Sequence, residues 1–169
     1  MRRWLQPLAI VGCASLVVTF GSRAVARRFL FPTPDVPAIA GLPGFIEHRL
    51  VARDGVVVRA LELRASSAAP VVVHFHNNRE SAEQTAGIAH ELAARGLGVV
   101  LVEYRGYGAS TGASPSEEGL YADAEAALDL LAARGVGPDH IVLWGTSLGT
   151  GVAVGADGRT YVVQVFAQY

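Results

Sequence analysis

The 169-residue sequence contains no lysine and a single cysteine, Cys13. Its 14 cationic side chains are all arginine, and with 15 acidic residues the formal net charge is −1. One cysteine excludes an intrachain disulfide and any metal site built from several thiolates. A net charge near zero provides no extended basic surface for nucleic acid. Because no phosphate-binding or metal-ligand motif occurs either, we expect no cofactor, no metal and no nucleic-acid partner.

The chain begins with an apolar segment. Residues 4–22 are uncharged and follow two arginines, and as a helix rising ~1.5 Å per residue they are just long enough to cross a bilayer core. We therefore expect residues 1–31 to form a membrane anchor, which places the rest of the chain at a membrane. Two alternatives stay open: cleavage after Ala26 as a signal peptide, giving a secreted or periplasmic protein, or a lipid attached to Cys13.

A linker and a hairpin are predicted next. Four prolines within residues 32–44 disfavour a helix or a central strand and indicate an extended linker, so the folded domain is expected over residues 45–169. Two alternating runs, residues 45–52 and 56–64, flank an Arg-Asp-Gly turn. This pattern predicts a β-hairpin.

The remaining pattern alternates between strand and helix. Residues 71–75, 97–104 and 141–144 are nearly continuous apolar runs, typical of strands buried on both faces. Residues 80–95 carry a helical stripe, and a capping box at Ser-Pro-Ser-Glu opens a second helix over 114–135. The order predicts an α/β fold with parallel strands and helices on both faces. Ligands collect at the carboxyl ends of such strands, so the loops that follow them are expected to form one cleft.

Ser147 follows the third buried strand, in the Gly-Thr-Ser-Leu-Gly sequence of residues 145–149. Gly-x-Ser-x-Gly between a strand and a helix predicts a nucleophile elbow, since a serine on such a tight turn needs neighbours without side chains. The backbone N–H of Leu148 would then face a developing oxyanion. A second N–H would come from the loop after the first buried strand, from Asn78 or, as second candidate, Asn77. Simple turn formation by these asparagines is the alternative interpretation.

Four segments of the sequence resemble the α/β-hydrolase superfamily. They are VHFHNN at 73–78, EYRGYG at 103–108, SPSEEGLYADA at 114–124 and GTSLG at 145–149. Together with the apolar N-terminus, they are most similar to the membrane-anchored serine hydrolases of the bud-emergence type. The resemblance implies hydrolysis of ester or thioester bonds in small lipid-like acyl substrates. It makes Ser147 the nucleophile and the N–H groups of Leu148 and Asn78 the oxyanion donors. Asn77 departs from the family, which usually has glycine there.

The resemblance also implies an acid and a histidine after the serine. Only Asp157, and no histidine, follows Ser147. His76 is the best placed upstream base, although the family has a histidine there that braces the loop. We therefore expect the N-terminal half of an α/β-hydrolase fold, either as an active serine hydrolase or as a truncated homologue without turnover. A half-sheet would leave an unpaired edge for a second chain to complete.

Overall fold

The computed structural model describes residues 30–32, 41–110 and 112–155, and the chain divides into two units, residues 1–32 and 33–169. Of the first unit, the structure describes only a short stretch that begins with the exposed Leu30. The expected membrane anchor or signal peptide and Asp157 lie outside the described residues. No helix within those three ranges is long and apolar enough to cross a membrane.

The second unit is built on one mixed sheet of five strands in the order β1-β2-β4-β3-β5. β1 and β2 form an antiparallel hairpin, and β2 also pairs antiparallel with β4. β3 lies between β4 and β5 and is parallel to both. The strands are β1 (Ile46–Val51), β2 (Val57–Leu63), β3 (Val71–Phe75), β4 (Gly98–Glu103) and β5 (Ile141–Gly145). The predicted hairpin and the three predicted strands are therefore confirmed, and β3 and β4 are buried as expected. The burial predicted for β5 is wrong, because only Leu143 and Gly145 of this strand are buried.

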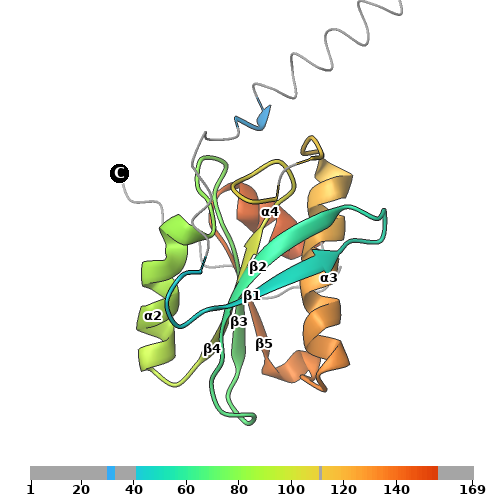
Figure 1. Cartoon of the computed structure of the whole chain (residues 1–169). Helices are drawn as coiled ribbons and strands as arrows, with labels where there is room; N and C mark the ends of the chain where they lie inside the picture. Colours follow the sequence, from blue (N-terminus) through green and yellow to red (C-terminus); the bar gives the residue numbers. More distant parts are fainter. Residues whose placement is uncertain (1–29, 33–40, 111, 156–169) are drawn as a thin grey trace, which may run out of the picture. The chain divides into compact units, whose positions relative to one another are not determined.

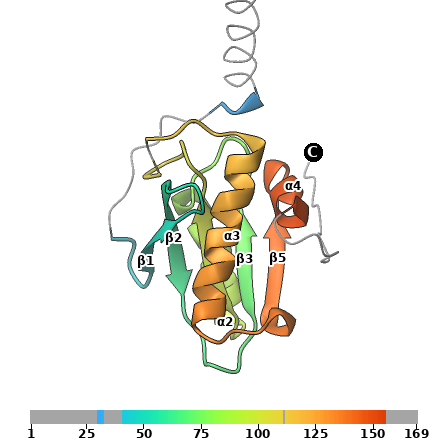
Figure 2. The same ribbon diagram turned by 90° about the vertical axis from the view of Figure 1, so that its right-hand side faces the viewer.

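Helices cover both faces of this sheet (Figure 1). On one face, α2 (Ala86–Ala94) packs against β2 and β4. On the other, α3 (Glu117–Ala133) and α4 (Leu148–Gly155) lie side by side, with α3 against β1 and β4 and α4 against β3 and β5 (Figure 2). The α/β layering expected from the alternation of strands and helices is confirmed.

Two helix starts differ from the prediction. The helix expected from residue 80 begins as a 3-10 turn, Glu83–Thr85, because Gln84 and Thr85 donate to carbonyls three residues back. A second 3-10 turn, Pro138–His140, precedes β5. The cap of α3 is Ser116, whose hydroxyl accepts from the N–H of Gly119 at 3.2 Å. The capping box predicted two residues earlier is wrong, because Pro115 is buried and packs close to Gly106 instead of opening the helix.

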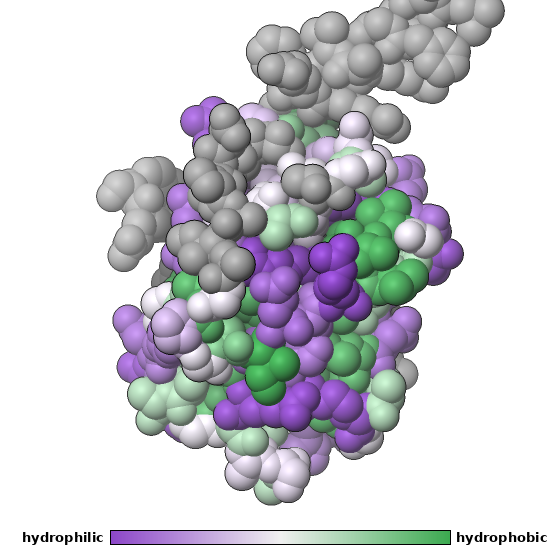
Figure 3. Space-filling view, viewed as in Figure 1, coloured by the Kyte–Doolittle hydropathy of each residue, from purple (hydrophilic) through white to green (hydrophobic). Residues whose placement is uncertain are grey.

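The two edges of the sheet are both partly exposed. β4 lies at the centre, and all six of its residues are buried. β1 forms one edge and exposes Glu47 and Arg49 as well as Val51, which is 68% exposed, and Figure 3 shows hydrophilic residues beside hydrophobic ones on this face. Such charge on an edge strand discourages pairing with another sheet. Among the described residues β5 pairs with β3 alone, and its Val142 is 47% exposed. The second chain expected at an open edge stays a prediction.

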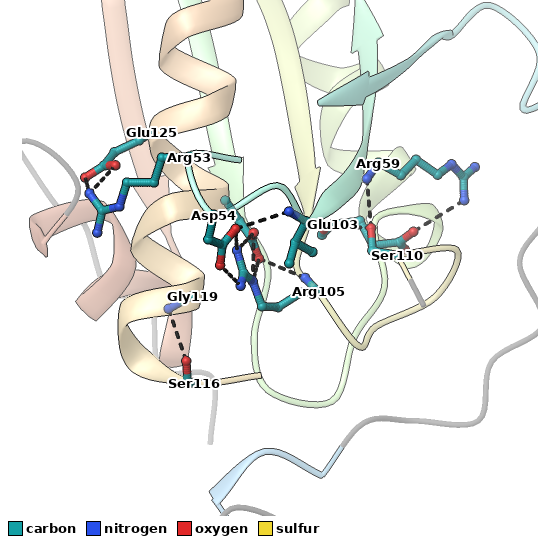
Figure 4. A network of polar contacts seen from close by, with 11 residues as sticks. Arg53, Asp54, Arg59, Glu103, Arg105, Ser110, Ser116, Gly119 and Glu125 are labelled. Atoms are coloured by element: carbon teal, nitrogen blue, oxygen red, sulfur yellow. Dashed lines mark hydrogen bonds and ion pairs between the residues drawn. The ribbon is translucent and has the colours of Figure 1, made fainter. Parts of the chain in front are cut away.

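A buried guanidinium joins three segments of the unit (Figure 4). Arg105, in the loop after β4, donates from Nη2 to Asp123 Oδ1 of α3 at 2.8 Å and also pairs with Asp54 at the tip of the hairpin. The Asp123 carboxylate also accepts from the backbone N–H of Arg105 at 2.9 Å. Gly119 provides the space, since a Cβ there would lie 2.8 Å from Arg105 Cδ. The hairpin tip, the loop and α3 are thereby held together.

We expect Arg105→Lys to lower the free energy of unfolding by about 2–4 kcal/mol, because one ammonium cannot replace the forked donors shared by two carboxylates. Urea denaturation followed by circular dichroism measures the change. Arg95→Lys is the matched control: its ion pair with Glu91 is exposed and 4.0 Å long, so its effect should stay below about 0.5 kcal/mol. Equal effects of the two substitutions would contradict this account of Arg105.

Candidate active site

The Gly-Thr-Ser-Leu-Gly segment forms a sharp turn between β5 and α4. Ser147 has a φ angle of 51°, and it is the one non-glycine residue with positive φ in the part of the chain that the structure describes. Left-handed backbone costs a side-chain-bearing residue roughly 1–2 kcal/mol, so the surrounding contacts must hold it. Ser147 is exposed, and α4 begins at the next residue, Leu148. The strand, strained serine and helix follow one another as a nucleophile elbow requires.

The two glycines of the segment permit contacts that any side chain would block. A Cβ on Gly149 would lie 2.1 Å from the carbonyl oxygen of Phe75 in β3, and a Cβ on Gly145 would lie 2.1 Å from the carbonyl oxygen of Gly149. The Phe75 carbonyl also accepts from the N–H of Thr146 at 3.1 Å. The start of α4 is therefore pressed against the end of β3. As the first residue of α4, Leu148 has an N–H that cannot be paired within the helix.

The loop after β3 meets this turn at the same edge of the sheet. β3 and β5 are parallel neighbours, and Phe75 is paired with Gly145 at their carboxyl ends. In the loop, Asn77 Oδ1 accepts from the N–H of Arg79 at 2.8 Å, which is ordinary asparagine turn chemistry. Asn78 is held differently, because its Oδ1 accepts from the hydroxyl of Tyr107 at 2.5 Å. The structure thus brings the predicted donor loop and the predicted elbow to adjacent strand ends.

His76 is enclosed in the protein. Its ring is completely buried, lies 4.4 Å from the ring of Tyr104 and bonds through Nδ1 to the Asn77 carbonyl at 2.7 Å. Burial lowers the pKa of His76 to about 4, so the ring is neutral at pH 7. Within the described ranges, no side chain makes a hydrogen bond to the Ser147 hydroxyl and His76 Nε2 has no partner. In this arrangement the His76 ring bonds to its own loop, and no hydrogen bond joins it to Ser147 within the described residues.

His74, two residues earlier on the same strand, lies in the interior. Its ring packs edge-on against Trp144 of β5 with ring centres 5.5 Å apart. Burial lowers the pKa of His74 to about 4. Neither His74 nor His76 therefore carries charge near neutral pH. In the described part of the chain, no group of three or more His, Cys, Asp or Glu side chains is arranged to hold a metal ion.

Glu103, at the end of β4, ties the loops at this edge together, although the sequence patterns do not single it out. The carboxylate is fully buried and accepts from the N–H of Ala82 at 3.1 Å and from the N–H of Ala109 at 2.8 Å. Gly108 has no Cβ to block this contact, since one would lie 2.1 Å from Glu103 Oε1. One carboxylate thus fastens both the segment after β3 and the loop after β4. The available signal was an acidic residue ending an otherwise apolar strand before a glycine-rich loop.

The protonation of Glu103 is set by its surroundings. Burial and, to a smaller extent, the nearby Glu83 carboxylate together raise the pKa of Glu103 to about 7. The Arg59 guanidinium, 3.5 Å from Glu103 Oε2, opposes this effect. Arg59 also pairs with Glu83, and its backbone N–H donates to the Ser110 hydroxyl at 2.8 Å (Figure 4). The carboxylate is therefore partly protonated near neutral pH.

Comparison with known proteins extends these observations. Residues 66–161 match the family described as serine aminopeptidase, S33. An uncharacterized protein of Mycobacterium tuberculosis (strain CDC 1551 / Oshkosh) is 36% identical over 159 residues, which cover 90% of this chain and 56% of that protein. The lysophosphatidylserine lipase ABHD12 of Gallus gallus is 39% identical over 89 residues, or 52% of this chain and 23% of the lipase. The chain spans 56% or less of the length of these relatives.

Solved structures of esterases share the fold. A bacterial heroin esterase is 26% identical, with a TM-score of 0.57 over 73% of this chain and 44% of the esterase. An esterase of Pyrococcus furiosus is 18% identical, with a TM-score of 0.59 over 72% of this chain and 51% of the esterase. At 18% identity the second likeness concerns the fold alone. The sheet and its helices thus correspond to part of an esterase fold.

Gly149→Ala is expected to lower the free energy of unfolding by at least about 2 kcal/mol, because the added methyl group would overlap the Phe75 carbonyl. Gly151→Ala is the matched control in the same helix. Nothing lies within 4 Å of a Cβ at Gly151, so its stability should be unchanged or raised by up to about 1 kcal/mol. Chemical denaturation of both variants measures the difference. A Gly149→Ala protein as stable as the Gly151→Ala protein would contradict the close contact.

The pKa of Glu103 predicts a pH dependence of stability. Folding raises this pKa from 4.5 to about 7, so between those values the folded state holds a proton that the unfolded chain releases. The resulting stabilisation is complete below pH 4.5 and is lost as the pH rises through 7. The glutamine side chain of Glu103→Gln carries no charge at any of these pH values. The free energy of unfolding of this variant, measured relative to that of the native protein, should therefore increase as the pH rises across this range, by on the order of 1–3 kcal/mol.

Urea denaturation at a series of pH values measures this difference. Glu118→Gln, on the exposed first turn of α3, is the control and should show no comparable trend. A Glu103→Gln difference that stays constant with pH would show that Glu103 does not take up the proton.

Proposed function

We propose that this chain, which belongs to the serine aminopeptidase S33 family of the α/β-hydrolase superfamily, hydrolyses ester bonds through a Ser147 acyl-enzyme. The observation that carries the proposal is the exposed Ser147 at φ 51°, set between β5 and α4. This strained turn is what allows a serine hydroxyl to project from the crest of a sheet. The esterase and lipase relatives support ester bonds as the reaction class.

The proposed chemistry is two-step acyl transfer. The Ser147 hydroxyl oxygen attacks the acyl carbonyl carbon, giving a tetrahedral intermediate with a negatively charged oxygen. The backbone N–H of Leu148 and that of Asn78, with Asn77 as second candidate, donate hydrogen bonds to this oxygen. The proton lost by the serine hydroxyl passes to the departing alkoxide, which leaves as the alcohol as the ester C–O bond breaks. Water then attacks the acyl-serine, its oxygen joins the acyl carbon to release the acid, and one of its protons restores the serine hydroxyl. Each donor of this kind accounts for about 10²–10³ in rate in other hydrolases.

The proposal also includes a class of substrate. The apolar residues 4–22, as a membrane anchor, would hold the site near lipid, and one relative is named a lysophosphatidylserine lipase. The resemblance to membrane-anchored hydrolases of the bud-emergence type also supports lipid-like acyl esters or thioesters. We therefore propose small acyl substrates of this kind and a location at a membrane.

A second candidate function is favoured by one observation. All five histidines of the sequence lie in the described part of the chain, and none of them bonds to the Ser147 hydroxyl. A serine with no base bonded to it loses several orders of magnitude in turnover. The second candidate is therefore that these 169 residues by themselves form the elbow without turning over esters.

A fluorophosphonate probe tests the proposal, because it phosphonylates an activated serine. We expect labelling of the native chain at Ser147, its loss in Ser147→Ala, and hydrolysis of a short-chain p-nitrophenyl ester above the Ser147→Ala background. Ser67→Ala, in the exposed loop before β3, is the control and should label like the native chain.

The outcomes separate the two candidates. Labelling that persists in Ser147→Ala would contradict the assignment of the nucleophile. A native chain with neither labelling nor turnover above the Ser147→Ala background would contradict the hydrolase and support the second candidate.

A further inference from the structure

Tyr107 belongs to the loop after β4, yet its hydroxyl contacts the loop after β3. We propose that Tyr107 is a positioning residue that holds Asn78 in place, so that this loop presents its backbone N–H to the acyl oxygen at Ser147. The inference rests on the proposed function, because it assumes that the backbone N–H of Asn78 donates a hydrogen bond to the oxyanion. Tyr107 itself touches no reacting atom in this scheme and acts through Asn78.

The hydrogen bond between the two loops is short and shielded from solvent on one side. Tyr107 is completely buried, and its hydroxyl donates to Asn78 Oδ1 at 2.5 Å, below the usual 2.7–2.8 Å for such bonds. Burial raises the pKa of Tyr107 to about 12, so the hydroxyl keeps its proton and remains a donor at any ordinary working pH. Neighbouring Asn77 is fixed from within its own loop, by the N–H of Arg79. Asn78 is thus a point at which a side chain of the loop after β3 is held from the loop after β4.

Neighbouring rings hold the ring of Tyr107 in place, and this determines where its hydroxyl lies. The ring of Tyr107 lies 5.2 Å from that of His76 at an interplanar angle of 64°, and 6.0 Å from that of Tyr104 at 73°. The backbone N–H of Tyr107 donates to the Tyr104 carbonyl at 3.1 Å, which closes the turn beneath the ring. His76 in turn bonds to the Asn77 carbonyl. The ring, the imidazole and the donor loop therefore form one packed unit.

This anchor has a chemical consequence. An oxyanion donor must lie about 2.7–3.1 Å from the developing charge, and its benefit falls steeply when the loop that carries it shifts. Short loops of polar residues are mobile unless side chains or neighbours hold them. A bond from Tyr107 to the side chain of Asn78 fixes the residue whose backbone N–H is the proposed donor. Loss of the hydroxyl alone should therefore slow chemistry at Ser147 while leaving the fold intact.

Tyr107→Phe tests this role, because it removes the hydroxyl and keeps the ring that packs on His76. We expect the maximal rate of Ser147 phosphonylation by a fluorophosphonate to fall about 10–100-fold, with the half-saturating probe concentration unchanged. Hydrogen exchange of the amides of residues 77–79 should become faster. Tyr121→Phe, which removes a hydroxyl bonded to Glu117 on the exposed face of α3, is the matched control and should change neither quantity.

Asn78→Ala gives a second, independent variant. It retains the proposed backbone donor and removes the acceptor of the Tyr107 hydroxyl. If Tyr107 acts through Asn78, the double variant should be no slower than Asn78→Ala alone, because that variant has already lost the acceptor of the Tyr107 hydroxyl. Effects that multiply in the double variant would overturn the proposal.

Two further outcomes decide the matter. Phosphonylation of Tyr107→Phe at the native rate would overturn the positioning role. If the native chain itself is not phosphonylated at Ser147, the proposed function fails, and hydrogen exchange alone tests Tyr107. Faster exchange at residues 77–79 in Tyr107→Phe would then still support its hold on the loop, and unchanged exchange would overturn it.

Discussion

The close contact between the start of α4 and the end of β3 is the constraint on which the candidate site depends. Gly149 presses against the Phe75 carbonyl at a distance that leaves no room for a Cβ, and Gly145 is packed against Gly149 in the same way. The chain must therefore reverse within the single residue Ser147, which accounts for its positive φ angle. The strain at the serine is stabilised by the packing of two strands and a helix. The exposure of Ser147 and the start of α4 at Leu148 both accompany this turn.

The rest of the edge is held by buried polar side chains rather than by apolar packing alone. Glu103 fastens the segment after β3 and the loop after β4, and Arg105 connects that loop to α3 and to the hairpin tip. Tyr107 joins the same two loops through its hydrogen bond to Asn78. Groups buried in this way are costly to leave unpaired, so each bond restricts where its loop can lie. A loop fixed at several points can keep a hydrogen-bond donor in place without help from substrate.

Local patterns predicted most of the fold and the sharp turn at Ser147, whereas the buried polar contacts of the neighbouring loops were not predictable. The elbow, the hairpin and the buried strands were recognisable because each depends on residues close together in sequence. Tyr107 and Asn78 are 29 positions apart, and Arg105 and Asp54 are 51 apart, so their pairing depends on strand order, which periodicity does not specify. The helix cap was predicted two residues before Ser116, because helix-start patterns do not include the contact of Pro115 with Gly106 within the loop between β4 and α3.

The central claim is that packing of the two glycines presents Ser147 as a nucleophile with an N–H donor beside it. The most direct measurement is a crystal structure of the chain after reaction with a fluorophosphonate. The account predicts phosphorus bonded to the Ser147 hydroxyl oxygen, a positive φ at Ser147, and a phosphoryl oxygen within about 3 Å of the Leu148 nitrogen. An adduct on another side chain, or a Ser147 with negative φ and its hydroxyl turned into the protein, would contradict it.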